Sequence, residues 1–117
     1  MLKREWERFK LRAIWSWEGW LYCWRFEKSV IQWFWANIAS ATLAFILDLS
    51  SAERAIVLAL GILVLAAELM NTAVEKAVDH TSLERNPLAK AAKDCASGAV
   101  ALTAIAVGVA WLAILIG

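Results

Sequence analysis

Three long stretches without a charged side chain constrain this chain more than any other feature. They are residues 30–47, 55–67 and 95–117. A helix needs about 20 apolar residues to cross the hydrocarbon core of a bilayer. The third stretch meets this length, and the first does so with Trp33 and Trp35 as interfacial anchors near its start. The second is long enough only if residues 68–78, which are mixed in polarity, continue the same helix.

Apolar residues make up 62% of the chain, well above the share in an ordinary soluble domain. We therefore predict an all-α membrane protein with transmembrane helices at residues 30–47, 54–78 and 95–116. The 117 residues are enough for one domain, so residues 1–117 are expected to form a single unit.

The N-terminal segment, residues 1–28, has a different pattern. Its large apolar residues recur every three or four positions, so they share one face of a helix: Leu2, Trp6, Phe9, Ala13, Trp17, Trp20 and Trp24. Most charged residues lie elsewhere around the same helix. This pattern predicts an amphipathic helix in the membrane surface, with tryptophans at the headgroup level. The alternative is a soluble helix packed on a partner.

The basic residues predict the orientation in the membrane. Seven of them precede the first uncharged stretch, and four lie in or beside the connection around residues 80–94, whereas only Arg54 lies near the first turn. The excess of basic residues on cytoplasmic segments then places the N-terminus and residues 80–94 in the cytoplasm. Cys23 and Cys95 are isolated and lie on that side, so we expect neither a disulfide nor a metal site from them.

An acidic stripe follows the second uncharged stretch, in AELMNTAVEKAVD, residues 67–79. At about 100° per residue, Glu75 and Asp79 each lie about 20° from Glu68 around the helix. Stacked carboxylates repel one another and are costly in lipid. The stripe therefore needs compensating cations, either a metal ion or basic side chains.

Three classes of function can use such a stripe. Phosphoryl transfer needs a metal, basic groups and a base for the attacking hydroxyl, and Glu75 with a second acid could hold magnesium while Glu68 reaches a hydroxyl in the membrane. A small ion-coupled transporter needs an intramembrane carboxylate. A non-enzymatic membrane subunit could pair the acids with a partner's bases. The acids and Lys93 at the membrane boundary mildly favour phosphate chemistry, although no phosphate-binding glycine loop is present.

The same segments resemble the bacterial integral-membrane diacylglycerol kinase family, which includes relatives that phosphorylate undecaprenol. The similarity rests on E-x-x-N-[ST]-A-[IV]-E-x-x-V-D at residues 68–79, A-K-D at residues 92–94 and S-W-x-G at residues 16–19. It extends from about Arg8 to Trp111. The resemblance implies a homotrimer with active sites shared between subunits, ATP and Mg²⁺, a lipid substrate and no nucleic acid. It also implies a bacterial cytoplasmic (inner) membrane location.

The resemblance also assigns roles to residues. Glu68 would be the catalytic base, Glu27 and Glu75 the metal ligands, and Asn71 a supporting residue. On spacing alone, by contrast, Glu27 is more simply explained as a surface residue paired with Arg25 or Lys28. The residues implied to bind ATP are Arg8, Trp15, Glu27, Glu75, Glu84, Arg85, Asn86, Lys93 and Asp94. Those implied to bind the lipid are Arg8, Ser16, Trp17, Arg54, Glu68, Ser97 and Trp111.

The lipid itself is predicted less directly. Residues 86–90, NPLAK, are closer to the undecaprenol kinase branch, whereas WRFEKSVIQW, residues 24–33, is closer to the diacylglycerol branch. We predict ATP-dependent phosphorylation of 1,2-diacylglycerol to phosphatidic acid at the cytoplasmic interface. Undecaprenol is the alternative substrate within the family, and the ion-coupled transporter is the alternative outside it.

Overall fold

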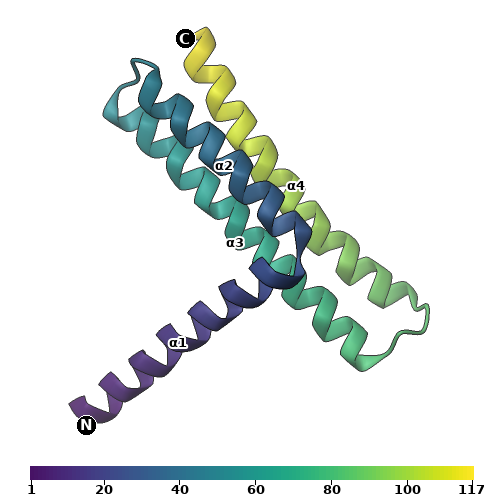
Figure 1. The fold of residues 1–117 in the computed structure, drawn as a ribbon. Coiled ribbons are helices and arrows are strands. Elements are labelled where there is room, and N and C mark those ends of the chain that lie inside the picture. The colour runs from purple at the N-terminus through teal and green to yellow at the C-terminus, as the bar shows by residue number, and fades with distance from the viewer.

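A computed structural model describes all residues, 1–117, as four helices. They are α1 (Leu2–Phe26), α2 (Lys28–Ile46), α3 (Ser51–Thr81) and α4 (Pro87–Ile116), shown in Figure 1. Three of them, α2, α3 and α4, are long and apolar enough to cross a membrane. The predictions of an all-helical chain and of three candidate spans are confirmed.

The starts of α3 and α4 follow local capping rather than the limits of the uncharged stretches. Ser50 and Glu53 form a reciprocal capping box that starts α3, so this helix begins at Ser51 rather than at residue 54. Asn86 caps α4 by accepting from the backbone N–H of Leu88, 2.8 Å away, and Pro87 occupies the first turn. The helix therefore starts eight residues before the predicted span. Hydropathy locates the part that can lie in lipid, whereas caps locate the ends of the helix.

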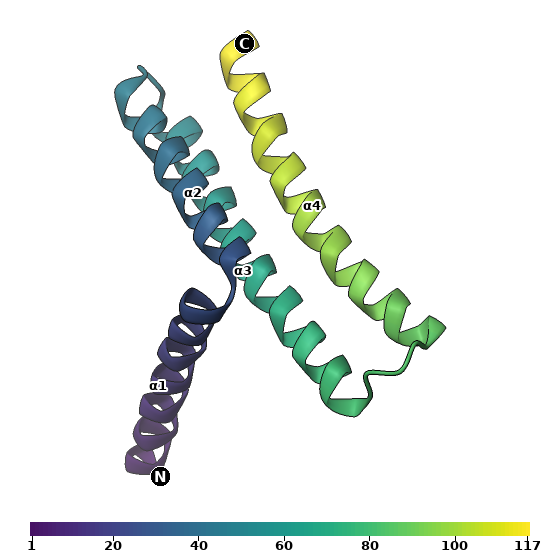
Figure 2. The same ribbon diagram turned by 45° about the vertical axis from the view of Figure 1, so that its right-hand side comes forward.

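Of the three long helices, α3 is the one that packs against both of the others. Both α2 and α4 contact α3, and Figures 1 and 2 show the three helices as one bundle. Only 9 of 117 residues are buried, among them Val30, Ala44, Val57 and Val64 along this contact. Most apolar side chains of the spans therefore face outward, as expected for a chain surrounded by lipid or by other subunits.

The first helix, α1, leaves the bundle. Figures 1 and 2 show its N-terminal part extending away from the other three helices. Its C-terminal end is attached by aromatic contacts, since the rings of Trp20 and Trp24 lie 6.3 and 5.0 Å from that of Phe34 on α2. Glu27 alone separates α1 from α2, and its extended backbone (φ −118°, ψ 105°) makes the bend.

The end of the bundle beyond this bend is a hairpin of two helices. In Figure 1 the C-terminal turns of α3 and the first turns of α4 extend past the start of α2. Residues 82–86 connect them. The hairpin carries the second half of the acidic stripe and the A-K-D segment, so both lie outside the three-helix part of the bundle.

One polar contact joins α2 and α3 deep in the bundle. The side-chain amide of Asn37 donates to the backbone oxygen of Gly61 at 2.9 Å and to that of Trp33 at 3.2 Å. A Cβ on residue 61 would overlap the Asn37 side-chain oxygen and lie 3.2 Å from its Cγ. Glycine at position 61 is therefore what permits the two helices to approach at this level. A cavity of about 90 Å³ lies beside the contact.

Candidate active site

The first part of the acidic stripe lies on α3 where the helix is still inside the bundle. Glu68 is 5% exposed, and its Oε2 has no hydrogen-bond partner. Asn71 donates from Nδ2 to Oε1 of Glu75 at 3.2 Å, while its own buried Oδ1 is also without a partner. A buried carboxylate oxygen and a buried amide oxygen thus remain available to a hydroxyl or cation.

Glu27 joins this group from the bend between α1 and α2. Its carboxylate and that of Glu75 are both within electrostatic range of Glu68. Its own partner is Lys76 on α3, with Nζ 3.3 Å from Oε1. The pairing predicted from spacing, with Arg25 or Lys28, is therefore wrong. A side chain one or two residues away is easily reached in sequence, but the bend turns Glu27 toward α3.

The carboxylates of Glu27 and Glu75 are the candidate ligands for magnesium. The chain holds no cluster of three or more His, Cys, Asp or Glu residues that could bind a metal alone. Magnesium in phosphate-transferring sites needs only one or two carboxylates, because water and phosphate oxygens complete its octahedral shell. Glu27 and Glu75, with one lysine and one amide as their present partners, fit a metal shared with a phosphate ligand.

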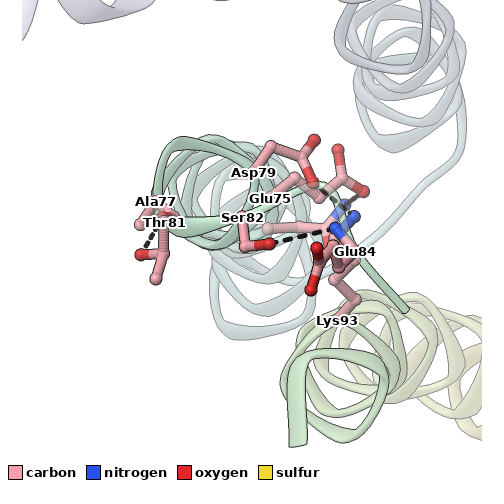
Figure 3. A network of polar contacts seen from close by, with 8 residues as sticks. Glu75, Ala77, Asp79, Thr81, Ser82, Glu84 and Lys93 are labelled. Carbon is pink, nitrogen blue, oxygen red and sulfur yellow. Dashed lines mark hydrogen bonds and ion pairs between the residues drawn. The ribbon is translucent and has the colours of Figure 1, made fainter. Parts of the chain in front are cut away.

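The second part of the stripe is compensated by lysine. Lys93 of α4 reaches across the hairpin to Asp79 of α3, with Nζ 2.6 Å from Oδ1 (Figure 3). Asp94 instead pairs with Lys90 on its own helix, also at 2.6 Å. Lys93 and Asp94, predicted as a functional pair, are thus adjacent but have separate partners. The expectation that cations balance the stripe is met at Asp79 by a basic side chain.

A cavity of about 610 Å³ opens at the end of the hairpin. This volume is within the range of small-molecule sites. Five of its lining residues were predicted to bind ATP: Glu84, Arg85, Asn86, Lys93 and Asp94. Asp79 and Lys90, which were not, also line it. The structure therefore brings five of the predicted nucleotide residues around one open cavity that carries both positive and negative groups.

The predicted residues of α1 lie apart from this cluster within one chain. Arg8 pairs with Glu5 at 3.3 Å, and the Ser16 hydroxyl donates to the Arg12 backbone oxygen at 2.9 Å. Trp15 and Trp17 are exposed. No hydrogen bond or ion pair joins these four residues to Glu68 or to the carboxylates around it in the same chain.

Two further predicted residues have structural contacts of their own. Arg54 donates from Nε to the Ala44 backbone oxygen at 2.8 Å and from Nη2 to that of Leu49 at 3.3 Å. It therefore closes the C-terminal end of α2, about 21 Å along α3 from Glu68 at ~1.5 Å per residue. This position does not support the predicted contact with the lipid beside Glu68.

Trp111 donates from its indole nitrogen to the Ser40 hydroxyl at 2.9 Å, which joins α4 to α2. Ser97 is exposed on α4 and makes no side-chain hydrogen bond. Neither side chain takes part in the carboxylate cluster on α3. The indole N–H of Trp111 thus has its hydrogen-bond partner inside the bundle. The Ser97 hydroxyl is exposed and can contact a molecule that lies against α4.

Sequence reasoning missed Lys76 as a partner in the site. It named Asp79 in the stripe but assigned it no role. Ser29 and Trp33, on the first turns of α2, are also within reach of the Glu68 carboxylate. No local spacing signals any of these contacts, because each joins helices that are far apart in the sequence.

Cys23 is the buried residue of α1, and it lies within electrostatic range of Glu27 and Glu68. Burial raises the pKa of its thiol, which the Thr72 hydroxyl partly offsets, and the negative charge of Glu27 raises that pKa further. The thiol therefore stays protonated near neutral pH and is a poor nucleophile. Cys95 is free and exposed.

Comparison with known sequences supplies independent information. A family model described as "Prokaryotic diacylglycerol kinase" matches residues 14–115. A diacylglycerol kinase of Pseudomonas aeruginosa is 46% identical over 101 residues, which cover 85% of this chain and 80% of that protein. A diacylglycerol kinase of Escherichia coli K12 is 30% identical over 103 residues, covering 88% and 84%. An undecaprenol kinase of Bacillus subtilis is 44% identical over 61 residues, covering 52% and 50%.

Proposed function

The chain belongs to the prokaryotic diacylglycerol kinase family, and from this premise we propose that it transfers the γ-phosphoryl group of ATP to the hydroxyl of 1,2-diacylglycerol. The products are phosphatidic acid and ADP. We further propose that residues 1–117 act as one kinase domain in the bacterial inner membrane. The basic N-terminal segment and the hairpin then lie on the cytoplasmic side, where ATP is available.

The observation that carries this proposal is the unpartnered carboxylate oxygen of Glu68, buried two helical turns inside Glu75. In the proposed step the lipid hydroxyl oxygen bonds to the γ-phosphorus, and its proton passes to the Glu68 carboxylate. The bond between the γ-phosphorus and the oxygen bridging to the β-phosphate breaks, and that oxygen leaves with ADP. A base that is inside the bundle and has one oxygen without a hydrogen-bond partner suits a hydroxyl presented by a membrane lipid.

Glu27 and Glu75 are the proposed ligands of Mg²⁺, which when bound neutralises charge on the transferred phosphate. The hydrogen bond from Asn71 to Glu75 supports this role by fixing one carboxylate oxygen and leaving the other for the metal. Glu75 is seven residues from Glu68, about 10 Å along the helix, so this proposed metal ligand lies toward the polar end of the site and the proposed base lies deeper in the bundle.

The open cavity of the hairpin is the proposed site for the nucleotide. Lys93 now pairs with Asp79. When the nucleotide binds, its ammonium would leave Asp79 and donate to a phosphate oxygen, which is also an anionic acceptor. Asp94 and the connection at residues 84–86 would line the rest of the nucleotide site.

We propose that a homotrimer completes the site. The N-terminal part of α1 extends away from its own bundle (Figure 2), so residues of α1 could contact ATP or lipid bound to a neighbouring subunit; those proposed are Arg8, Trp15, Ser16 and Trp17. The outward-facing Ser97 on α4 could contact the lipid of such a neighbour. The apolar side chains that one chain leaves exposed are consistent with contacts to other subunits.

Undecaprenol is the second candidate substrate. It is favoured by the similarity to the undecaprenol kinase of Bacillus subtilis and by the N-P-L-A-K segment at residues 86–90. The same base, metal ligands and nucleotide cavity would act on its terminal hydroxyl, so the choice of lipid changes the substrate but not the mechanism.

The test is transfer of phosphate from γ-labelled ATP in mixed micelles, with diacylglycerol and undecaprenol offered separately. Glu68→Gln should lower turnover by about 100-fold or more, which is the usual contribution of a general base. Glu18→Gln is the matched control, since it removes an exposed carboxylate from α1 that makes no ion pair.

Three outcomes decide the proposal. Labelled phosphatidic acid that is lost in Glu68→Gln and kept in Glu18→Gln supports both the reaction and the base. Labelled undecaprenyl phosphate alone moves the protein to the second substrate. Full activity in Glu68→Gln, with helical content unchanged, refutes the assignment of the base.

A further inference from the structure

Lys76 is the basic side chain at the junction of three helices. Its Nζ lies 3.3 Å from Oε1 of Glu27 and 6.0 Å from the centre of the Tyr22 ring. Tyr22 belongs to α1, Glu27 to the bend and Lys76 to α3. The lysine therefore contacts the one carboxylate of the cluster that comes from outside α3.

The two partners differ in exposure. The Glu27 side chain is 18% exposed, whereas that of Lys76 is 54% exposed. The carboxylate is thus held in place by its surroundings, while the lysine reaches it from solvent along a flexible stem. A half-exposed lysine can leave such a pair without burying its charge elsewhere.

The charges around this pair are mostly negative. Glu27 and Glu75 each lie within electrostatic range of Glu68, and Lys76 is the cation that forms an ion pair within this group. A divalent cation bound to Glu27 would place like charge beside the ammonium of Lys76, and both would compete for one carboxylate. Lys76 and the metal are therefore alternative partners of Glu27.

We infer that Lys76 is the resident counter-cation of Glu27 and opposes binding of the divalent metal, which must displace it. This inference rests on the proposed function, because it takes Glu27 as a metal ligand. It adds that the metal affinity of this protein is set partly by a residue that neither binds the metal nor touches the reacting atoms.

A purely structural role for Lys76 predicts the opposite effect. If the lysine only fixes the angle between α1 and α3, its loss would loosen Glu27 and weaken the metal site or leave it unchanged. If the lysine competes with the metal, its loss strengthens the site. The sign of the change in metal affinity therefore separates the two roles.

The experiment is a titration of the full chain in detergent micelles with Mn²⁺, without nucleotide, following the electron paramagnetic resonance signal of the free ion. Lys76→Met keeps the length and apolar character of the stem but removes the charge. It should tighten Mn²⁺ binding by up to about fivefold, the upper limit expected from an exposed ion pair. Lys76→Arg should bind Mn²⁺ as the unmodified chain does.

Lys10→Met is the matched control. Lys10 also pairs with a glutamate, at 3.1 Å from Glu7, and also lies near an aromatic ring, 5.9 Å from Trp6, but it is on the distant part of α1. It should leave Mn²⁺ binding unchanged.

Glu27→Gln distinguishes a failure of the proposed metal role of Glu27 from a failure of the inference about Lys76. If it does not weaken Mn²⁺ binding, the metal role of Glu27 fails, and this inference fails with it. If it weakens binding while Lys76→Met also weakens it or leaves it unchanged, Lys76 is not a competitor and the proposed function stands. Tighter binding in Lys76→Met, lost again when Glu27→Gln is added, supports the inference.

Discussion

Replacing Gly61 by alanine should separate helices α2 and α3 at the middle of the bundle. The added Cβ would overlap the side-chain oxygen of Asn37 and lie 3.2 Å from its Cγ, so Asn37 has to move. When it moves, its 2.9 Å hydrogen bond to the Gly61 backbone oxygen is lost. The neighbouring cavity of about 90 Å³ gives the displaced side chain only limited room.

The size of the effect follows from three terms. An interhelical hydrogen bond in a membrane protein contributes about 0.6 kcal/mol on average and at most about 1.7. Overpacking of a close contact costs about 1–3 kcal/mol. Alanine regains up to about 1 kcal/mol because it is the better helix former. We therefore expect Gly61→Ala to lower the free energy of unfolding by about 1–3 kcal/mol.

The assay is reversible unfolding in mixed micelles, followed by circular dichroism. Gly108→Ala is the control, because nothing lies within 4 Å of the Cβ that it would add. Asn37→Ala should cost only the hydrogen bond. In that background the clash is gone, so Gly61→Ala should be neutral or stabilising by up to about 1 kcal/mol.

The double substitution provides the decisive comparison. If Gly61→Ala destabilises the protein equally with and without the Asn37 side chain, the two residues are not coupled. The close approach of α2 and α3 would then depend on something other than the absence of a Cβ at position 61.

Two further predictions concern other parts of the fold. Arg54→Met should lower the free energy of unfolding by about 1–2 kcal/mol, because two backbone oxygens at the end of α2 lose a charged donor; unchanged stability in the same unfolding assay would refute this explanation. In the Cys95→Ala variant, Cys23 should react slowly with maleimide at neutral pH and faster as pH rises, because burial raises the pKa of its thiol. Labelling in SDS should remove the delay, and equally fast labelling of the folded protein would contradict the buried position.

The sequence alone predicted much of the fold because its signals are local. An uncharged stretch predicts a span from its own length, and a period of 3.6 residues places Glu68 and Glu75 on one face without knowledge of any other helix. The ends of the helices were placed less well. The capping box of Ser50 and Glu53 was present in the sequence, but hydropathy was used to set the limit at residue 54.

The candidate site was predicted in part for the same reason. The residues of the hairpin lie close together in the sequence, and the structure gathers five of the residues implied to bind ATP around one cavity. The expectation that cations, either a metal ion or basic side chains, would balance the stripe left the partners open. Arg54 shows the opposite case: the resemblance implied a contact with the lipid, whereas in the structure its side chain donates to two backbone oxygens at the end of α2.

What the sequence determined by itself is therefore the set of helices and the presence of acids where a membrane helix meets water. The tertiary structure decided which cations Glu27 and Asp79 receive. Lys76 meets Glu27 and Lys93 meets Asp79 because a bend and a hairpin bring separate helices together. It also decided that Asn37 lies against Gly61. Periodicity fixes the direction of a side chain around its own helix, but its partner depends on how the helices pack, which no local pattern encodes.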